Sequence, residues 1–142
     1  DLVRSRGLGD VYKRQVITQA TAYEFLKRGY LNPHIEKIKR TYGEKQKAML
    51  NALKAYFPSE VSWIHPQGGM FLWVTTPSYI NLTEVFTEAI EEKVAYIVGS
   101  AFYVDGSGTN NMRLNFSYST LDQIDEGIKR LGRLLSRKVK KV

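Results

Sequence analysis

The sequence predicts an α+β fold, in which helices cover a small and mostly antiparallel sheet. Apolar residues recur at helical spacing towards both ends of the chain, whereas the middle holds short runs rich in β-branched and aromatic residues. Turn-forming residues at 65–69 and 105–110 separate those short runs. With 142 residues, the chain has the length of one domain with a core of its own.

Two helical patterns open the predicted fold. The first covers residues 16–28. The second begins at Asn32, which is placed to cap a helix that has Pro33 in its first turn. Pro58 ends this second helix. Apolar residues at helical spacing give it one expected buried face, made of Ile35, Ile38, Tyr42, Met49, Leu53 and Tyr56.

A hairpin is predicted next. Residues 61–64 and 70–74 are rich in β-formers, and the segment between them contains Pro66, Gly68 and Gly69. Paired glycines permit positive φ and allow another group to approach the backbone closely. A simple turn explains the pair, and a flat ligand resting on the bare backbone is the functional alternative.

The remaining elements follow from capping signals and turn chemistry. Asn81 and Glu84 have the spacing of a capping box at the start of a short helix, and residues 94–98 form a β-rich run. Thr120 and Gln123 repeat that spacing before the last helix. Its expected apolar stripe consists of Ile124, Ile128, Leu131 and Leu135.

The segment 111–117 carries the strongest functional signal. Apolar residues (Met112, Leu114, Phe116) alternate with polar ones (Arg113, Asn115, Ser117), which is typical of a half-buried strand. Arginine presents a flat, permanently charged fork that fits a carboxylate with two parallel hydrogen bonds, and a strand would hold that fork rigidly. A surface arginine paired with a neighbouring acid is the simpler explanation, and the segment taken alone favours it.

An ordered set of segments extends along most of the chain. In chain order they are Gly29-Tyr30-Leu31, His34-Ile35, Arg40-Thr41-Tyr42, Pro66 to Val74, Val98-Gly99 with Phe102, Arg113 to Ser117 and the helix 124–135. Together they resemble the C-terminal part of a fold-type I, pyridoxal-phosphate (PLP)-dependent aminotransferase of class I/II. The group with 2-aminoadipate, aromatic and kynurenine aminotransferases is the most similar. Val98 stands where the family usually has proline.

The resemblance implies a substrate-binding role for Arg113, which occupies the position that clamps the substrate's α-carboxylate, and we assign Gly69 to the same site. This resemblance outweighs the interpretation of Arg113 as a surface arginine paired with a neighbouring acid. In the family, the Schiff-base lysine, the acidic partner of the pyridinium and the phosphate loop lie in an upstream stretch that has no counterpart here. We therefore expect no catalytic, cofactor-binding or metal-ligating residue in this chain, and no activity from the chain alone.

The resemblance also implies a domain organisation. Residues 1–15 have no amphipathic period, and we expect a non-native or linker segment there. Residues 16–30 are expected to be the helical end of a missing large domain, and residues 31–142 the small domain. The implied full-length protein is a homodimer that transfers an amino group between an amino acid and a 2-oxo acid. The alternatives are the effector-sensing half of a transcription regulator and a non-catalytic association domain.

Composition excludes several other classes. The net charge is +7, but residues 130–142 hold six basic residues and no acid, which is typical of a solvated helix end and not of a nucleic-acid surface. No apolar run reaches the length of a membrane span. The chain has no cysteine, which agrees with a cytoplasmic location, and His34 and His65 lack the neighbours of metal ligands.

Overall fold

The computed structural model describes residues 16–139. The chain forms two compact units, of which one ends at Arg40 and the other begins at Thr41. The segment 1–15, expected to be non-native or linker sequence, lies outside the described residues.

The first unit consists of helices. Residues 16–27 are helical, a turn with Gly29 at φ +72° follows, and helix α2 (Leu31–Tyr56) begins there and continues into the second unit. The backbone N–H of His34 donates to the carbonyl of Tyr30 at 3.2 Å, so helical bonding starts before Asn32. The assignment of Asn32 as the N-cap is therefore wrong. Pro33 still lies in the first turn, where its missing N–H is not needed.

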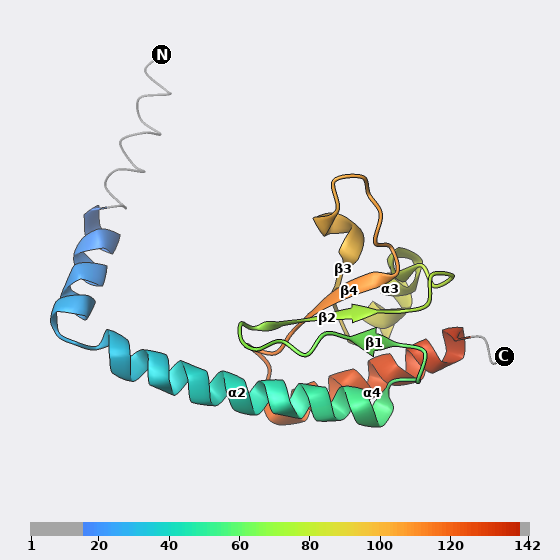
Figure 1. Ribbon diagram of the computed structural model, residues 1–142, viewed down its shortest axis with the longest axis horizontal. Helices are drawn as coiled ribbons and strands as arrows, with labels where there is room; N and C mark the ends of the chain where they lie inside the picture. The colour runs from blue at the N-terminus through green and yellow to red at the C-terminus, as the bar shows by residue number, and fades with distance from the viewer. Residues whose placement is uncertain (1–15, 140–142) are drawn as a thin grey trace, which may run out of the picture. The chain divides into compact units, whose positions relative to one another are not determined.

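The second unit contains the sheet (Figure 1). Its elements are β1 (Ser62–Trp63), β2 (Phe71–Thr75), α3 (Leu82–Glu91), β3 (Ile97–Val98), the 3-10 helix η1 (Gly99–Phe102), β4 (Asn111–Asn115) and α4 (Leu121–Lys138). The strand order is β1-β2-β4-β3, and every neighbouring pair is antiparallel. The predicted hairpin is the pair β1–β2, and the α+β fold class is confirmed.

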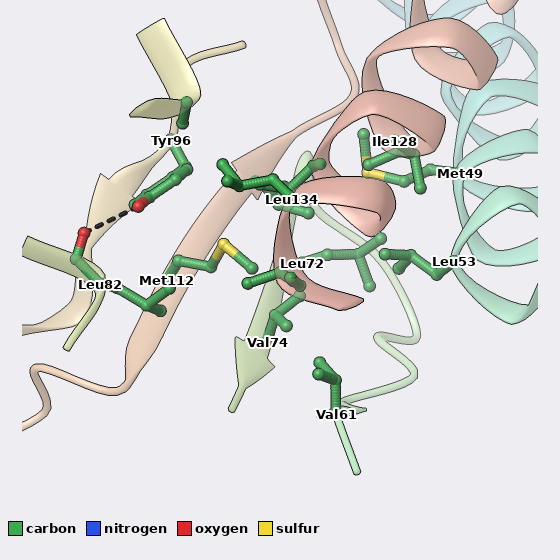
Figure 2. Close-up of a cluster of buried hydrophobic side chains, with 14 of the residues drawn as sticks. Met49, Leu53, Val61, Leu72, Val74, Leu82, Tyr96, Met112, Ile128 and Leu134 are labelled. Carbon is green, nitrogen blue, oxygen red and sulfur yellow. Dashed lines mark hydrogen bonds between the residues drawn. The ribbon is translucent and has the colours of Figure 1, made fainter. Parts of the chain in front are cut away.

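One face of this sheet forms the core. Leu72 and Val74 of β2 are buried, as are Met112 and Leu114 of β4, and all four belong to one cluster with side chains of the helices. Figure 2 shows Leu72, Val74 and Met112 of the sheet together with labelled side chains of α2 and α4, which are Met49, Leu53, Ile128 and Leu134. Burying an aliphatic side chain of this size stabilises a fold by about 1.5–3 kcal/mol. The period-two pattern of the sequence thus leaves the alternate residues of β2 and β4 on the opposite, open face.

Helix α4 forms as the sequence predicts. The Thr120 hydroxyl accepts from the backbone N–H of Gln123 at 3.3 Å, and the Gln123 side chain accepts from the backbone N–H of Thr120 at 2.9 Å. This completes the predicted capping box. The expected apolar stripe is buried, together with Leu134.

The start of α3 differs from the predicted capping box. Asn81 is the N-cap, and its side chain accepts from the backbone N–H of Thr83 at 3.0 Å. Glu84, however, accepts from the side-chain amide of Asn81 at 2.8 Å, so only the N-cap half of the prediction is correct. A glutamate that binds the capping side chain holds it in place without covering a backbone donor.

The predicted buried face of α2 is present only in part. Met49 and Leu53 are buried in the core of the second unit, and Tyr42 packs against that core. Ile35, which belongs to the first unit, is 37% exposed. One continuous face along the whole helix was therefore the wrong expectation, since a helical repeat shows which residues share a side and not what covers them.

Exposed ion pairs involve much of the basic C-terminal helix. Arg137 pairs with Glu92 at 2.9 Å, Lys138 pairs with Glu88, and Arg130 pairs with Glu126 at 2.7 Å within α4. Exposed pairs of this kind add little stability. They do show that acidic groups partly neutralise the basic cluster. Among residues 16–139, no helix combines the length and the apolar character needed to cross a bilayer.

Candidate functional site

Arg113 lies at the centre of the open sheet face. It is the middle residue of β4, directly opposite Trp73 of β2 on one side and Ile97 of β3 on the other. Its neighbours Met112 and Leu114 point into the core, so the pleat directs Arg113 to the other face. Strands on both sides fix the backbone from which this side chain extends.

The guanidinium of Arg113 lies over two aromatic rings. Its central carbon lies 4.0 Å from the ring centre of Phe71 and 4.7 Å from that of Phe102, above the face of each ring. Phe71 belongs to β2, and Phe102 is the last residue of η1. The negative faces of both rings attract the cation. Three segments that are distant in the sequence thus converge on one charged group.

No acid balances this charge within the described chain. Among residues 16–139, Arg113 forms neither a hydrogen bond nor an ion pair, although it is half-buried. The alternative interpretation, a surface arginine paired with a neighbouring acid, is therefore not supported, since Arg113 has no acidic partner in this part of the chain. A partly desolvated guanidinium with free N–H donors is suited to an anionic ligand.

The turn after β3 brings Phe102 to this site. Val98, in place of the family's usual proline, has φ −64°, which is within the range that a proline ring imposes. Gly99 follows and packs closely against Asn111 and Gly108. A Cβ at Gly99 would lie 2.5 Å from the Cβ of Asn111 and 2.6 Å from the carbonyl oxygen of Gly108. Val98 therefore has a φ that proline could also adopt, and Gly99 cannot be replaced by a larger residue without a clash.

Gly69 lies in the loop between β1 and β2. Its φ is +84°, and a Cβ at this position would have nothing within 4 Å. The backbone conformation therefore demands glycine here, whereas close packing does not. The loop leads through Met70 into Phe71, whose ring contacts Arg113. A substrate contact of Gly69 itself stays a prediction.

Sequence reasoning missed four aromatic residues of this face. Phe71 and Phe102 stack on Arg113, the ring centre of Trp73 lies 5.6 Å from that of Phe102, and the ring centre of Tyr103 lies 6.4 Å from that of Trp73. Phe71 and Trp73 could have been found from the alternation of β2, which places both on the face opposite Leu72. Phe102 and Tyr103 had no such signal, because a turn brings them there.

A separate cavity of about 520 Å³ lies beside α4. Its walls come mainly from α4, from the turn after α3 and from the end of β4, and Arg113 is not among them. Residues 16–139 contain no group of three acidic, histidine or cysteine side chains placed to hold a metal ion. The open sheet face around Arg113 is therefore the candidate site that the sequence and the geometry share.

Comparisons with known proteins give a consistent result. A family model described as aminotransferase class I and II matches residues 10–131. The chain is 40% identical over 136 residues to the 2-aminoadipate transaminase of Thermus thermophilus, a match that covers 94% of this chain and 33% of that protein. The solved structure of the multiple substrate aminotransferase from Thermococcus profundus is 40% identical, with a TM-score of 0.81 over 85% of this chain and 30% of that one.

The chain also resembles a protein of another kind. It is 30% identical over 118 residues to an uncharacterised HTH-type transcriptional regulator of Bacillus subtilis, a match that covers 83% of this chain and 24% of that protein. The chain spans about a third of the length of the first curated relatives it matches. The family match begins at residue 10, inside the segment expected to be non-native or linker, and the origin of residues 1–15 stays a prediction.

Proposed function

The chain belongs to the class I and II aminotransferase family, and from this premise we propose that it is the C-terminal small domain of a PLP-dependent aminotransferase. The full-length protein transfers an amino group from an amino acid to a 2-oxo acid. The similarity to a 2-aminoadipate transaminase and to a multiple substrate aminotransferase supports this proposal. The proposal does not extend to which amino acid is the donor.

In this proposal, Arg113 binds the α-carboxylate of the substrate. The observation that carries it is a half-buried guanidinium on a central strand, which lies over two aromatic rings and has no acid paired to it among residues 16–139. Two parallel N–H donors of the guanidinium meet the two carboxylate oxygens. Since β4 is fixed on both sides, this contact also orients the α-carbon of the substrate for reaction. Gly69 is proposed to border the same site.

We propose that the described residues do not hold PLP. A cofactor of this kind needs a lysine for its Schiff base, and every lysine among residues 16–139 lies on a helix or directly after one. None lies on a strand of the sheet beside Arg113. We therefore assign the cofactor and its chemistry to the part of the protein upstream of this chain, and we assign to this chain the binding and orientation of the substrate.

The first expected result separates these two contributions. Full-length protein with PLP should transfer amino groups from amino acids to 2-oxo acids, whereas the 142-residue chain mixed with PLP should not. The isolated chain should also give no saturable visible band that borohydride reduction fixes to one lysine. Circular dichroism verifies that the isolated chain is folded. A specific, saturable adduct on a single lysine of this chain would contradict the assignment, whereas scattered labelling of surface lysines would not.

We also propose that the full-length protein is a cytoplasmic homodimer, as the family resemblance implies.

We expect the isolated chain to self-associate, because its first unit exposes several apolar side chains: Val16, Ile17, Tyr23, Leu26 and Tyr30. Size-exclusion chromatography with light scattering over a concentration series should show a mass that rises with concentration. A monomer at every concentration would show that this apolar surface does not associate.

A second candidate function rests on the regulator resemblance. The aminotransferase-like half of such a regulator would bind an effector at the Arg113 site without turning it over. Identity to the regulator is 30%, compared with 40% to the transaminase, so the enzyme is favoured. The upstream reading frame distinguishes the two, because a regulator carries a helix-turn-helix domain before its aminotransferase-like half. Turnover by the full-length protein decides for the enzyme.

A further inference from the structure

The rings of Phe71 and Phe102 cover Arg113 in a specific manner. Each ring has the guanidinium carbon above its face, at 4.0 and 4.7 Å. Both side chains are partly open to solvent, Phe71 at 37% and Phe102 at 47%, so neither is a core residue. Burial in the hydrophobic core therefore does not explain why these two rings lie there.

Stacking and carboxylate binding use different parts of a guanidinium. The π faces of the group meet aromatic rings, whereas the five N–H donors point outward in the plane of the group. A guanidinium stacked on rings keeps its in-plane donors available for the two-pronged contact with a carboxylate. An unsupported arginine side chain has many rotamers, and binding would have to remove part of that conformational freedom.

The structure holds the two rings themselves in place. Phe71 is fixed within β2, whose pairing with β4 sets its distance from Arg113. Phe102 contacts Trp73 edge to face, with ring centres 5.6 Å apart. The turn that precedes Phe102 is anchored by the tight packing of Gly99 against Asn111. The aromatic contacts are thus part of the rigid framework around the arginine.

We propose that Phe71 and Phe102 are positioning residues, which hold the guanidinium of Arg113 in the orientation that accepts a carboxylate. This inference rests on the proposed function of Arg113 and deepens it. The two phenylalanines need not touch the substrate, because they act through the arginine. They set its direction before the substrate arrives, so that binding does not have to order the side chain.

The test measures carboxylate affinity directly in the full-length protein. Titration calorimetry gives the Kd of 4-methylpentanoate, and its uncharged primary amide serves as the reference probe. The variants are Phe71→Leu and Phe102→Leu, with Phe71→Tyr and Phe102→Tyr as ring-preserving replacements. Phe86→Leu is the matched control, because the ring of Phe86 also contacts an aromatic ring, that of Tyr96 with ring centres 5.3 Å apart, but is not one of the two rings that lie against the guanidinium of Arg113.

Each leucine variant should weaken carboxylate binding by about 3- to 30-fold, which is the range that loss of one cation–π contact gives. The affinity for the amide should stay within about twofold in the same variants, since the amide is uncharged. The tyrosine variants should bind the carboxylate nearly as well as the native protein. Phe86→Leu should leave the ratio between the two probes unchanged, even if it lowers the melting temperature.

The outcomes separate this proposal from the function on which it rests. If Arg113→Ala removes the preference for the carboxylate probe but both leucine variants keep it, the positioning role is wrong and the arginine assignment stands. If Arg113→Ala also keeps the preference, the carboxylate site itself is wrong. Equal weakening of both probes in the leucine variants would mean a general loss of structure and would overturn the positioning role.

Discussion

In the full-length aminotransferase that we propose, replacing Arg113 with alanine should lower kcat/KM for the amino acid substrate by on the order of 2–4 kcal/mol, or about 30- to 900-fold. The proposed carboxylate contact would be made in both the bound substrate and the transition state, and it would also set the substrate's orientation. KM should therefore rise while kcat falls. Steady-state kinetics over a range of substrate concentrations measures both.

The variant Arg113→Lys serves as the matched comparison. Lysine keeps the positive charge but offers a point charge instead of a planar fork, so it should recover only part of the lost kcat/KM. It also loses the planar group that lies over the rings of Phe71 and Phe102. Retention of PLP should be unchanged in both variants, because we place the cofactor's anchors upstream. A lysine variant with native kcat/KM would show that charge alone is sufficient.

Substituting Gly132 with alanine should destabilise the fold by about 2 kcal/mol or more. Gly132 is buried in α4, and a Cβ there would lie 2.9 Å from the carbonyl carbon of Tyr56 and closer still to its carbonyl oxygen. Both atoms are backbone at the end of α2, so no side-chain rotation can relieve the clash. The helices α2 and α4 would have to separate, which disturbs the core between them. Urea unfolding of the native and variant chains measures the loss.

Gly127 provides the control for this substitution. It lies in the same helix, but a Cβ at this position has nothing within 4 Å. Gly127→Ala should therefore stabilise the fold by up to about 1 kcal/mol, because alanine is the better helix former. Opposite signs at Gly127 and Gly132 would separate the steric effect from helix propensity. A neutral or stabilising Gly132→Ala would show that the two helices adjust to the extra methyl group.

Local signals in the sequence were sufficient for much of the fold. The alternation around Arg113 predicted a half-buried strand, and the spacing of Thr120 and Gln123 predicted a capping box, because each depends on residues close together in the chain. The glycine-rich turn at 65–69 predicted the β1–β2 hairpin for the same reason. A strand, a helix cap or a turn of this kind depends mainly on the local sequence and little on distant segments.

Features that depend on distant contacts could not be predicted. The pairing of β2 with β4 joins segments about 40 residues apart, and only this register places Phe71 beside Arg113. Gly132 gave no signal, since a glycine within a helical pattern does not show which backbone lies against it. The predicted start of α2 is two residues too late, because Asn32 and Pro33 satisfy the local rules for an N-cap and a first turn although the helix already begins at Leu31.

The central claim is that Arg113 binds the carboxylate of the substrate. The most direct test is kcat/KM of the full-length enzyme for an α-amino acid and for the same amine without its carboxylate, in the native protein and in Arg113→Ala. We expect the substitution to remove most of the activity on the amino acid while leaving the slower activity on the amine nearly unchanged. An equal loss on both substrates would contradict the claim and would make Arg113 a structural residue.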